Sequence, residues 1–225
     1  MAAELDIELG GEPMRLLGDR ALYWPARARL LIADLHLGKA DVFRHAGIGL
    51  PAGGTLHDLD RLATLLAHTR ATELWILGDV LHGPALASRW RESWEQWRAK
   101  HERLRIVALT GNHDRALRNA GLELTLAGAE VEDGPFALRH EPHPHPTLHV
   151  LCGHIHPLAA LPGMRKRFPS FWLRESMTVL PAFSHFTAGV APQLSAGERL
   201  VACVEGEAIA LPPFGRSIAG SVGAT

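Results

Sequence analysis

Residues 104–114, Leu-Arg-Ile-Val-Ala-Leu-Thr-Gly-Asn-His-Asp, place a short apolar run directly before residues that can turn the chain and bind a ligand. The run Leu104–Leu109 is short and mostly apolar, which predicts a buried strand. Gly111 allows a turn after it, and the polar side chains of Asn112-His113-Asp114 follow at once. In α/β sheets, ligands bind beyond the carboxyl ends of the strands, so this stretch predicts a binding site at the end of a sheet.

Two earlier stretches repeat this pattern. Arg29–Ala33 leads into Asp34-Leu35-His36, and Glu73–Leu77 leads into Gly78-Asp79. Helices are predicted between the strands, at Thr55–Thr69 with Thr55 as its N-cap, and at Ala87–Arg103. The first half of the chain therefore predicts alternating strands and helices around a buried parallel sheet.

The second half is richer in short strand candidates, with proline and glycine between them. They are Glu130–Glu132, Phe136–Arg139, His149–Cys152, Met177–Leu180, Leu200–Val204 and Ala208–Leu211. We expect an antiparallel meander here. Two of these strands also end in polar residues, His140 and Gly153-His154-Ile155-His156. Residues 1–225 are predicted to form one domain, with a loose tail after about residue 212.

The polar clusters together predict a metal centre, although each one alone is better explained as a cap or a turn. Seven side chains are suitable ligands: Asp34, His36, Asp79, Asn112, His140, His154 and His156. They offer carboxylate, amide and imidazole groups but no thiolate, which suits manganese, iron or zinc. Seven ligands are too many for one such ion. Two divalent ions that share a bridging carboxylate account for all of them.

The five clusters, taken together, resemble the metal-binding motifs of calcineurin-like metallophosphoesterases, and they span residues 34–156. The chain is most similar to the ligase-associated DNA damage response endonucleases, the PdeM group. The runs that carry this closer resemblance are Ala33–Lys39, Phe43–Ile48, Leu138–Pro142, Cys152–Pro157 and Leu180–Phe183. The resemblance implies an αββα fold, in which a sandwich of two mixed β-sheets is flanked by helices.

The resemblance also implies roles for the site residues. Asp34, His36, Asp79 and His156 would hold one metal, and Asp79, Asn112, His140 and His154 the other. His113 would protonate the leaving oxygen, and Asp114 would orient the His113 ring. Many relatives have a second aspartate a few residues after Gly-Asp, but this chain has His82, which could either support a metal ligand or approach a metal itself.

The function implied by the resemblance is a manganese-dependent DNA endonuclease that prefers single strands and acts in DNA repair beside a ligase and a helicase. One alternative is a phosphoesterase for nucleotides or other small phosphoesters. Another is a non-catalytic scaffold of the same fold, although the intact motifs and His113 argue against it.

Several cations and aromatic residues are weaker candidates for substrate contacts. Lys39, Arg44 and Arg115 follow the metal motifs and could grip phosphates, although a solvated or capping cation is the favoured interpretation of each. The run Arg165-Lys166-Arg167 is the best local patch for nucleic acid. Trp90, Trp94 and Trp97 lie at helical spacing, which favours packing in the core or in a homodimer over base stacking. His143 and His145 alternate with prolines and are interpreted as surface residues.

The composition is that of an ordinary soluble globular protein. Of its 225 residues, 47% are hydrophobic and 21% charged, with 23 Lys plus Arg against 24 Asp plus Glu. This balance counts mildly against a nucleic-acid partner, so any such surface would be local. No secretory signal and no apolar stretch long enough to span a bilayer is present in the sequence, which predicts a cytoplasmic protein without a membrane partner. Cys152 and Cys203 form no metal-binding or disulfide pattern, so we expect buried thiols.

Overall fold

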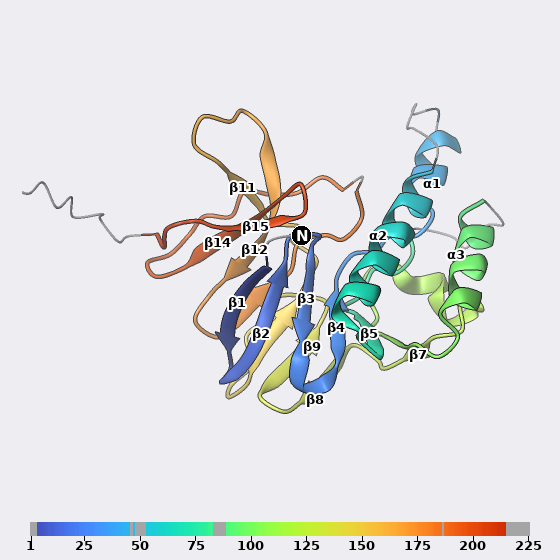
Figure 1. Ribbon diagram of the computed structural model, residues 1–225, viewed down its shortest axis with the longest axis horizontal. Helices are drawn as coiled ribbons and strands as arrows, with labels where there is room; N and C mark the ends of the chain where they lie inside the picture. Colours follow the sequence, from blue (N-terminus) through green and yellow to red (C-terminus); the bar gives the residue numbers. More distant parts are fainter. Residues whose placement is uncertain (1–3, 46, 48–52, 83–88, 186, 215–225) are drawn as a thin grey trace, which may run out of the picture.

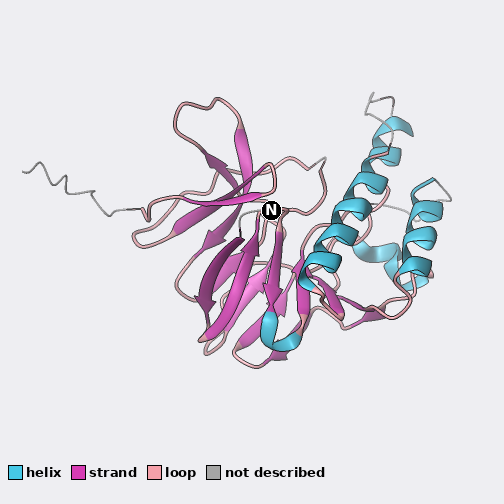
Figure 2. Ribbon diagram, viewed as in Figure 1, coloured by secondary structure: helices cyan, strands magenta, loops and turns pink. Residues whose placement is uncertain are grey.

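Two β-sheets pack face to face, and helices cover the outer face of one of them (Figures 1 and 2). The computed structural model describes residues 4–45, 47, 53–82, 89–185 and 187–214. This is the predicted sandwich of two mixed sheets with flanking helices. None of the described helices is both long and apolar enough to cross a bilayer.

The first sheet has seven strands in chain order, each hydrogen-bonded to the next. They are β1 (Glu4–Leu9), β2 (Glu12–Leu17), β3 (Ala21–Trp24), β4 (Arg29–Ile32), β5 (Glu73–Ile76), β6 (Arg105–Ala108) and β7 (Thr125–Leu126). Strands β1 to β4 pair antiparallel, whereas β4 to β7 pair parallel. The parallel part is the one predicted from the sequence. It brings the ends of β4, β5 and β6, and the motifs that follow them, to one edge of the sheet.

The second sheet follows the order β15-β14-β12-β13-β10-β9-β8, with β11 paired to β12. Its strands are β8 (Glu130–Asp133), β9 (Phe136–Arg139), β10 (His149–Cys152), β11 (Leu158–Ala160), β12 (Arg167–Leu173), β13 (Met177–Val179), β14 (Arg199–Val204) and β15 (Glu207–Ala210). The prediction of an antiparallel meander is wrong for its centre, because β10 pairs parallel with both β9 and β13. The proline-rich loop after β9 and the β11–β12 hairpin after β10 each return the chain to the same edge before the next strand begins.

Three α-helices and two short 3₁₀ helices complete the described chain. They are α1 (Lys39–His45), α2 (Gly54–Thr69), α3 (Arg89–Lys100), η1 (Pro25–Arg27) and η2 (Asp114–Asn119). The predicted N-cap of α2 is wrong. The cap position is Gly53, which has a φ of 91°, and Thr55 lies inside the helix. The Thr55 hydroxyl instead accepts a hydrogen bond from the Gly38 N–H at 3.4 Å, so it ties α2 to the loop after β4.

Two hydrophobic cores hold the layers together. One lies between the two sheets and includes Leu31, Trp75 and Leu138. The other lies between the first sheet and the helices and contains all three tryptophans of α3. Trp90, Trp94 and Trp97 are only 4%, 1% and 5% exposed, so they pack in the core and are not available for base stacking. Both cysteines are buried, as expected. The predicted loose tail lies mostly in residues 215–225, outside the described chain.

Candidate metal centre

The loops that follow β4, β5 and β10 lie side by side and are hydrogen-bonded to one another. The His36 N–H donates to the Asp79 carbonyl at 2.8 Å, and the Asp34 N–H donates to the Gly78 carbonyl at 3.2 Å. The His154 N–H donates to the Asp34 carboxylate, at 3.1 Å from Oδ2. Motifs that are up to 120 residues apart in the chain therefore meet at one edge of the sandwich.

The backbone is strained at this meeting point. Five of the seven predicted ligands have a positive φ, which non-glycine residues rarely adopt. The angles are 56° for Asp34, 49° for His36, 51° for Asp79, 71° for His154 and 53° for His156. Each such residue costs on the order of 1 kcal/mol or more. Strain concentrated on the predicted ligands indicates that the surrounding structure aims these side chains at a functional site.

The side chains form two groups that share Asp34. One group is Asp34, His36 and His156, and the other is Asp34, Asp79 and His140; within each, the potential ligand atoms lie within 4.8 Å of one another. His156 Nε2 is 3.3 Å from Asp34 Oδ1, and His140 Nε2 is 3.5 Å from Asp79 Oδ2. His36 Nε2 is 3.9 Å from the same Asp79 oxygen, so Asp79 lies within reach of both groups.

The remaining two predicted ligands join the second group through His140. Asn112 Oδ1 is 3.0 Å from His140 Nε2, and His154 Nδ1 is 3.1 Å from the same nitrogen. The structure therefore brings all seven predicted ligands together. It leaves His143 and His145 in a separate loop, where they interact with Glu141 and Glu132 respectively.

The buried imidazoles show that these residues fit a divalent metal. His36 is 4% exposed, and neither of its ring nitrogens has a hydrogen-bond partner among the described residues. Buried polar atoms are nearly always paired, so such a ring needs an explanation. Burial first, and then the nearby Lys39 charge, lowers the pKa of His36 to about 2. The ring is therefore neutral, which is the form that binds a metal.

Backbone carbonyls fix the orientation of two other histidines. His140 Nδ1 lies 2.9 Å from the Leu77 carbonyl, and His156 Nδ1 lies 2.9 Å from the Ala188 carbonyl. A proton on each Nδ1 would satisfy these contacts, and the unprotonated Nε2 would then be free to bind a metal. This arrangement is typical of metal-binding histidines, whose second nitrogen is held by a carbonyl or carboxylate.

Two motif glycines are required because other motif residues approach them closely. A Cβ at Gly111 would lie 2.3 Å from Asp79 Oδ1 and 2.4 Å from the Asp79 amide nitrogen. A Cβ at Gly153 would lie 2.6 Å from the Ala33 Cβ and 2.7 Å from Asp34 Oδ2. Any larger residue at either position would displace one of the two carboxylates.

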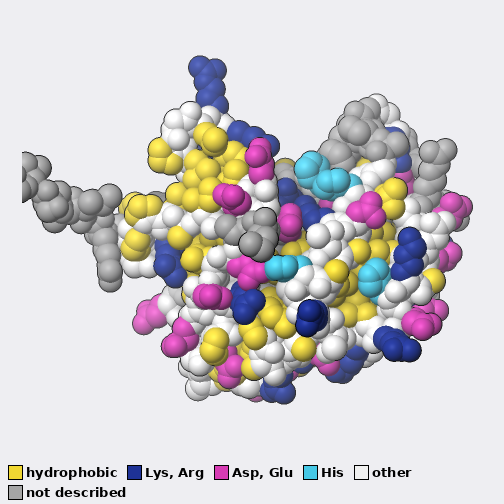
Figure 3. Space-filling model, viewed as in Figure 1, with side chains coloured by type: hydrophobic (Ala, Val, Ile, Leu, Met, Phe, Trp, Pro, Cys, Tyr) yellow, Lys and Arg dark blue, Asp and Glu magenta, His cyan; other side chains and the backbone are white. Residues whose placement is uncertain are grey.

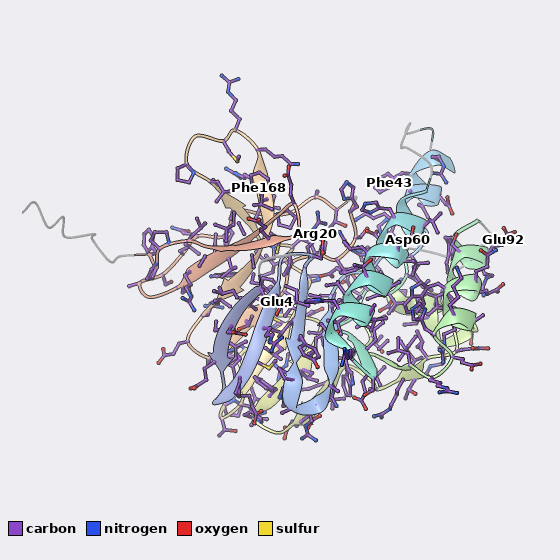
Figure 4. All side chains as sticks on the ribbon, in the orientation of Figure 1. Glu4, Arg20, Phe43, Asp60, Glu92 and Phe168 are labelled. Atoms are coloured by element: carbon purple, nitrogen blue, oxygen red, sulfur yellow. The ribbon has the colours of Figure 1, made fainter. Side chains whose placement is uncertain are left out.

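His113 and His82 lie beside the centre, and Asp114 lies under it. His113 is exposed, and its ring centroid is 5.7 Å from that of His36. The His82 ring stacks on those of Phe43 and His113 and meets His36 edge-on at 5.2 Å (Phe43 is labelled in Figure 4). Burial, followed by the charges of Lys39 and His113, lowers the pKa of His82 to about 4. The His82 ring therefore packs against the ring of one predicted ligand, His36.

The Asp114 carboxylate does not make the expected contact with His113. Its Oδ1 accepts the Leu81 N–H at 3.0 Å, and its Oδ2 accepts the Gly111 N–H at 2.9 Å. In the described chain, no hydrogen bond joins Asp114 to the His113 ring. Asp114 is 3% exposed, and its carboxylate instead joins the loop after β5, at Leu81, to the loop after β6, at Gly111.

The three predicted phosphate-binding cations differ in how near they lie to the centre. Lys39 is partly buried, donates to the Thr187 hydroxyl at 3.3 Å, and has a pKa lowered first by burial. Arg44 pairs with Asp41 on the same helix. Arg115 is exposed at the start of η2. Of the three, Lys39 has the strongest structural link to the predicted ligands, because the carboxylates of Asp34 and Asp79 act on its charge.

A groove of about 900 Å³ runs between α2 and the second sheet, and Figure 3 shows the hollow with histidines on one side. Lys166 and Arg167 of the predicted basic patch line it, together with His57 and His185. A small neighbouring cavity, lined by His156, shares residues such as Leu158 and Pro169 with the groove. The lining also includes four acids, Asp19, Asp60, Glu205 and Glu207, so its charge is mixed.

Comparison with known proteins identifies the class. The family model of calcineurin-like phosphoesterases matches residues 29–175, and the chain belongs to that family. It is therefore a metal-dependent phosphoesterase, a hydrolase of ester bonds with a divalent metal centre. A comparison with curated proteins finds no match.

Solved structures give a more particular likeness. The chain is similar to the Pseudomonas putida nuclease MPE, with 40% identity and a TM-score of 0.80, over 92% of this chain and 100% of that one. It is more distantly similar to Yfce, a phosphoesterase from E. coli, with 18% identity over 77% of this chain and 87% of that one and a TM-score of 0.43. AQ665, a protein of unknown function from Aquifex aeolicus, has 16% identity over 57% of this chain and 78% of that one, with a TM-score of 0.40.

Proposed function

We propose that this protein is a manganese-dependent phosphodiesterase with two metal ions, and that its substrate is DNA, with single strands preferred. The observation that carries the proposal is the pair of ligand groups that contain Asp34 and Asp79. One of them includes the buried His36 ring, whose nitrogens have no hydrogen-bond partner among the described residues. A donor set of carboxylate, amide oxygen and imidazole suits manganese, with iron and zinc as alternatives.

The residues that would hold the ions are those predicted from the sequence. Asp34, His36, Asp79 and His156 would hold the first, and Asp79, Asn112, His140 and His154 the second. When bound, two divalent ions lower the pKa of a water molecule and offset charge on the phosphoryl oxygens. Asp79 Oδ2 lies 3.9 Å from His36 Nε2 and 3.5 Å from His140 Nε2, so one carboxylate lies near both groups, which supports its role as the bridge.

The chain's own residues would complete the reaction. His113 is exposed beside the ligand rings, where its imidazole can protonate the oxygen that leaves the phosphate. Its backbone N–H donates to Asp79 Oδ1 at 3.0 Å, which helps to hold the proposed bridging carboxylate in place. Lys39 supplies a positive charge near the same carboxylates and can attract a phosphate.

DNA as the substrate is supported by the similarity to a nuclease and by the groove. The groove reaches the cavity beside His156, and Lys166 and Arg167 line it. Its mixed charge favours a loose grip on a few phosphates. A flexible single strand can bend toward such a centre more easily than a stiff duplex. A role in DNA repair beside a ligase and a helicase rests on the sequence resemblance alone.

Closed-circular single-stranded DNA tests the proposal, because it has no ends and only an endonuclease can cut it. The protein loaded with manganese should convert the circle to linear DNA, and Asp79→Asn should not. A nucleotide panel and a p-nitrophenyl diester are assayed in parallel.

The mixed charge of the groove also favours a second candidate, a phosphodiesterase for nucleotides or other small phosphoesters. If the circle stays intact while the small diester or a nucleotide is hydrolysed quickly, this second function replaces the first. The scaffold alternative loses its support, since the chain belongs to the phosphoesterase family and keeps groups of aspartate and histidine that could hold a metal.

A further inference from the structure

The segment after β13, described at residues 182–185 and 187–190, contacts three parts of the metal centre. The Ala188 carbonyl lies 2.9 Å from His156 Nδ1, and the Val190 N–H donates to the His156 carbonyl at 3.1 Å. The Ser184 N–H donates to the Asp34 carbonyl at 3.2 Å. The Thr187 hydroxyl accepts from Lys39 at 3.3 Å. The position of this segment therefore sets the orientation of one predicted ligand and supports the backbone of another.

The same segment is held from its other side by charged residues outside the five motifs. Both oxygens of the Asp58 carboxylate, on α2, accept the His185 N–H at 3.2 Å. Arg61, one turn further along α2, pairs with Asp58 at 3.2 Å, donates to the Phe183 carbonyl and lies 4.1 Å from the Phe183 ring centroid. Arg20 donates to the Ser184 carbonyl at 3.0 Å. Figure 4 shows Arg20 between α2 and the second sheet.

Stability alone does not account for burying these charges. Asp58 is 3% exposed, and burial raises the pKa of its carboxyl group, although the charge of Arg61 acts in the opposite direction. Replacing a buried ion pair by apolar residues of similar volume is often neutral or stabilising. A hydrophobic residue at position 58 would extend the leucine face of α2, but it could not accept the His185 N–H. The carboxylate is suited to fixing a backbone position.

We infer that Asp58 is a positioning residue for the metal centre: it anchors the described part of this segment to α2 at His185, and the segment in turn orients His156 and supports Asp34. The inference rests on the proposed function only in taking these two residues as metal ligands. Arg61 and Arg20 hold the same segment at Phe183 and Ser184. None of the three charged residues is itself assigned to a metal.

Manganese affinity of the Asp58→Asn variant tests the inference. The amide keeps the shape of the side chain but removes the charge and one acceptor oxygen. Partners of metal-binding histidines affect affinity by about 10- to 100-fold. Because Asp58 acts through one further contact, we expect about tenfold weaker manganese binding by titration calorimetry. Hydrolysis of a p-nitrophenyl diester should fall at low manganese and recover at high manganese, because a weakened site still fills by mass action.

Asp6→Asn is the matched control, because Asp6 undergoes the same change on the exposed side of β1. It should bind manganese as the unmodified protein does. If Asp58→Asn does not fold, Arg20→Lys replaces it, since lysine lacks the planar fork of arginine and should weaken the Ser184 contact.

The outcomes separate the two proposals. Equal manganese affinity in the unmodified protein and the folded variant overturns the positioning role alone. Loss of activity that no manganese concentration restores also overturns it. Failure of the unmodified protein to bind manganese overturns the proposed function.

Discussion

Gly153→Ala should weaken the metal centre while leaving the fold in place. Gly153 does not have a positive φ, so alanine fits the backbone, but its Cβ would lie 2.7 Å from Asp34 Oδ2 and 2.6 Å from the Ala33 Cβ. Ordinary contact begins at 3.4 Å, so the Asp34 carboxylate must move by about 0.7 Å. Shifts of this size at a reacting site have large effects, since about 1 Å can cost roughly 100-fold in rate.

The expected cost has two parts that can be measured separately. Overpacking of a filled site costs about 1–3 kcal/mol, which lowers the Tm of a chain of this size by about 2–4 °C for each kcal/mol. Displacement of a metal ligand should weaken manganese binding by at least about tenfold. Differential scanning calorimetry measures the first, and manganese titration with diester kinetics measures the second.

Gly163→Ala is the control for this experiment. Gly163 has a φ of 76° and open space around it, so alanine there should cost about 1 kcal/mol of backbone strain without moving any ligand. Manganese affinity should then be unchanged. The reasoning is refuted if Gly153→Ala binds manganese as tightly as the unmodified protein, or if both variants weaken binding equally.

Four further results are expected. Trp94→Ala should lose about 3–5 kcal/mol in urea unfolding, because it empties a side-chain site that is 1% exposed; a loss under 1 kcal/mol would contradict its place in the core. Burial raises the pKa of Glu73, but hydrogen bonds from Trp75 and Arg105 and the Arg29 charge lower it overall, below its ordinary 4.5. Glu73→Gln should therefore be less stable than the unmodified protein above pH 4.5, and this difference should vanish as the pH falls through the lowered pKa of Glu73; a difference that persists in acid would contradict this. His113→Ala should slow diesters with alkoxide leaving groups by about 10²–10⁴-fold and p-nitrophenolate esters far less; equal losses would point to a positioning role. If the protein contacts about two to four phosphates, the logarithm of its binding constant for single-stranded DNA should fall with the logarithm of salt concentration at a slope of roughly −1.5 to −3. Replacing Arg165, Lys166 and Arg167 together should flatten this slope; an unchanged slope would mean that the DNA does not contact these residues.

The parallel half of the first sheet and the metal motifs could be predicted because their signal is local. Each apolar run, such as Leu104–Leu109, is followed directly by the polar residues it presents, and parallel strands bring such ends together. The order of the motifs then predicted a single centre. In the structure, potential ligand atoms of Asp34, Asp79 and His140 lie within 4.8 Å of one another.

The rest depends on information that local sequence does not carry. The first strand, Glu4–Leu9, is a different case, because its acids alternate with apolar residues, which is a local strand signal that the prediction from the sequence does not use. The parallel pairing of β10 with β13 depends on where the β11–β12 hairpin returns the chain. Asp58 resembles a surface residue on an amphipathic helix, and its burial is decided by a segment 127 residues later. Asp114 looks like a partner of His113 in sequence, but the turn directs its carboxylate to backbone N–H groups.

Anomalous diffraction from crystals saturated with manganese tests the central claim most directly. Two peaks are predicted, with Asp79 in contact with both, Asp34, His36 and His156 around one, and Asn112, His140 and His154 around the other. The same preparation should hydrolyse a phosphodiester, and Asp79→Asn should lose both peaks and activity. A single fully occupied peak in a fully active preparation would contradict the two-ion account.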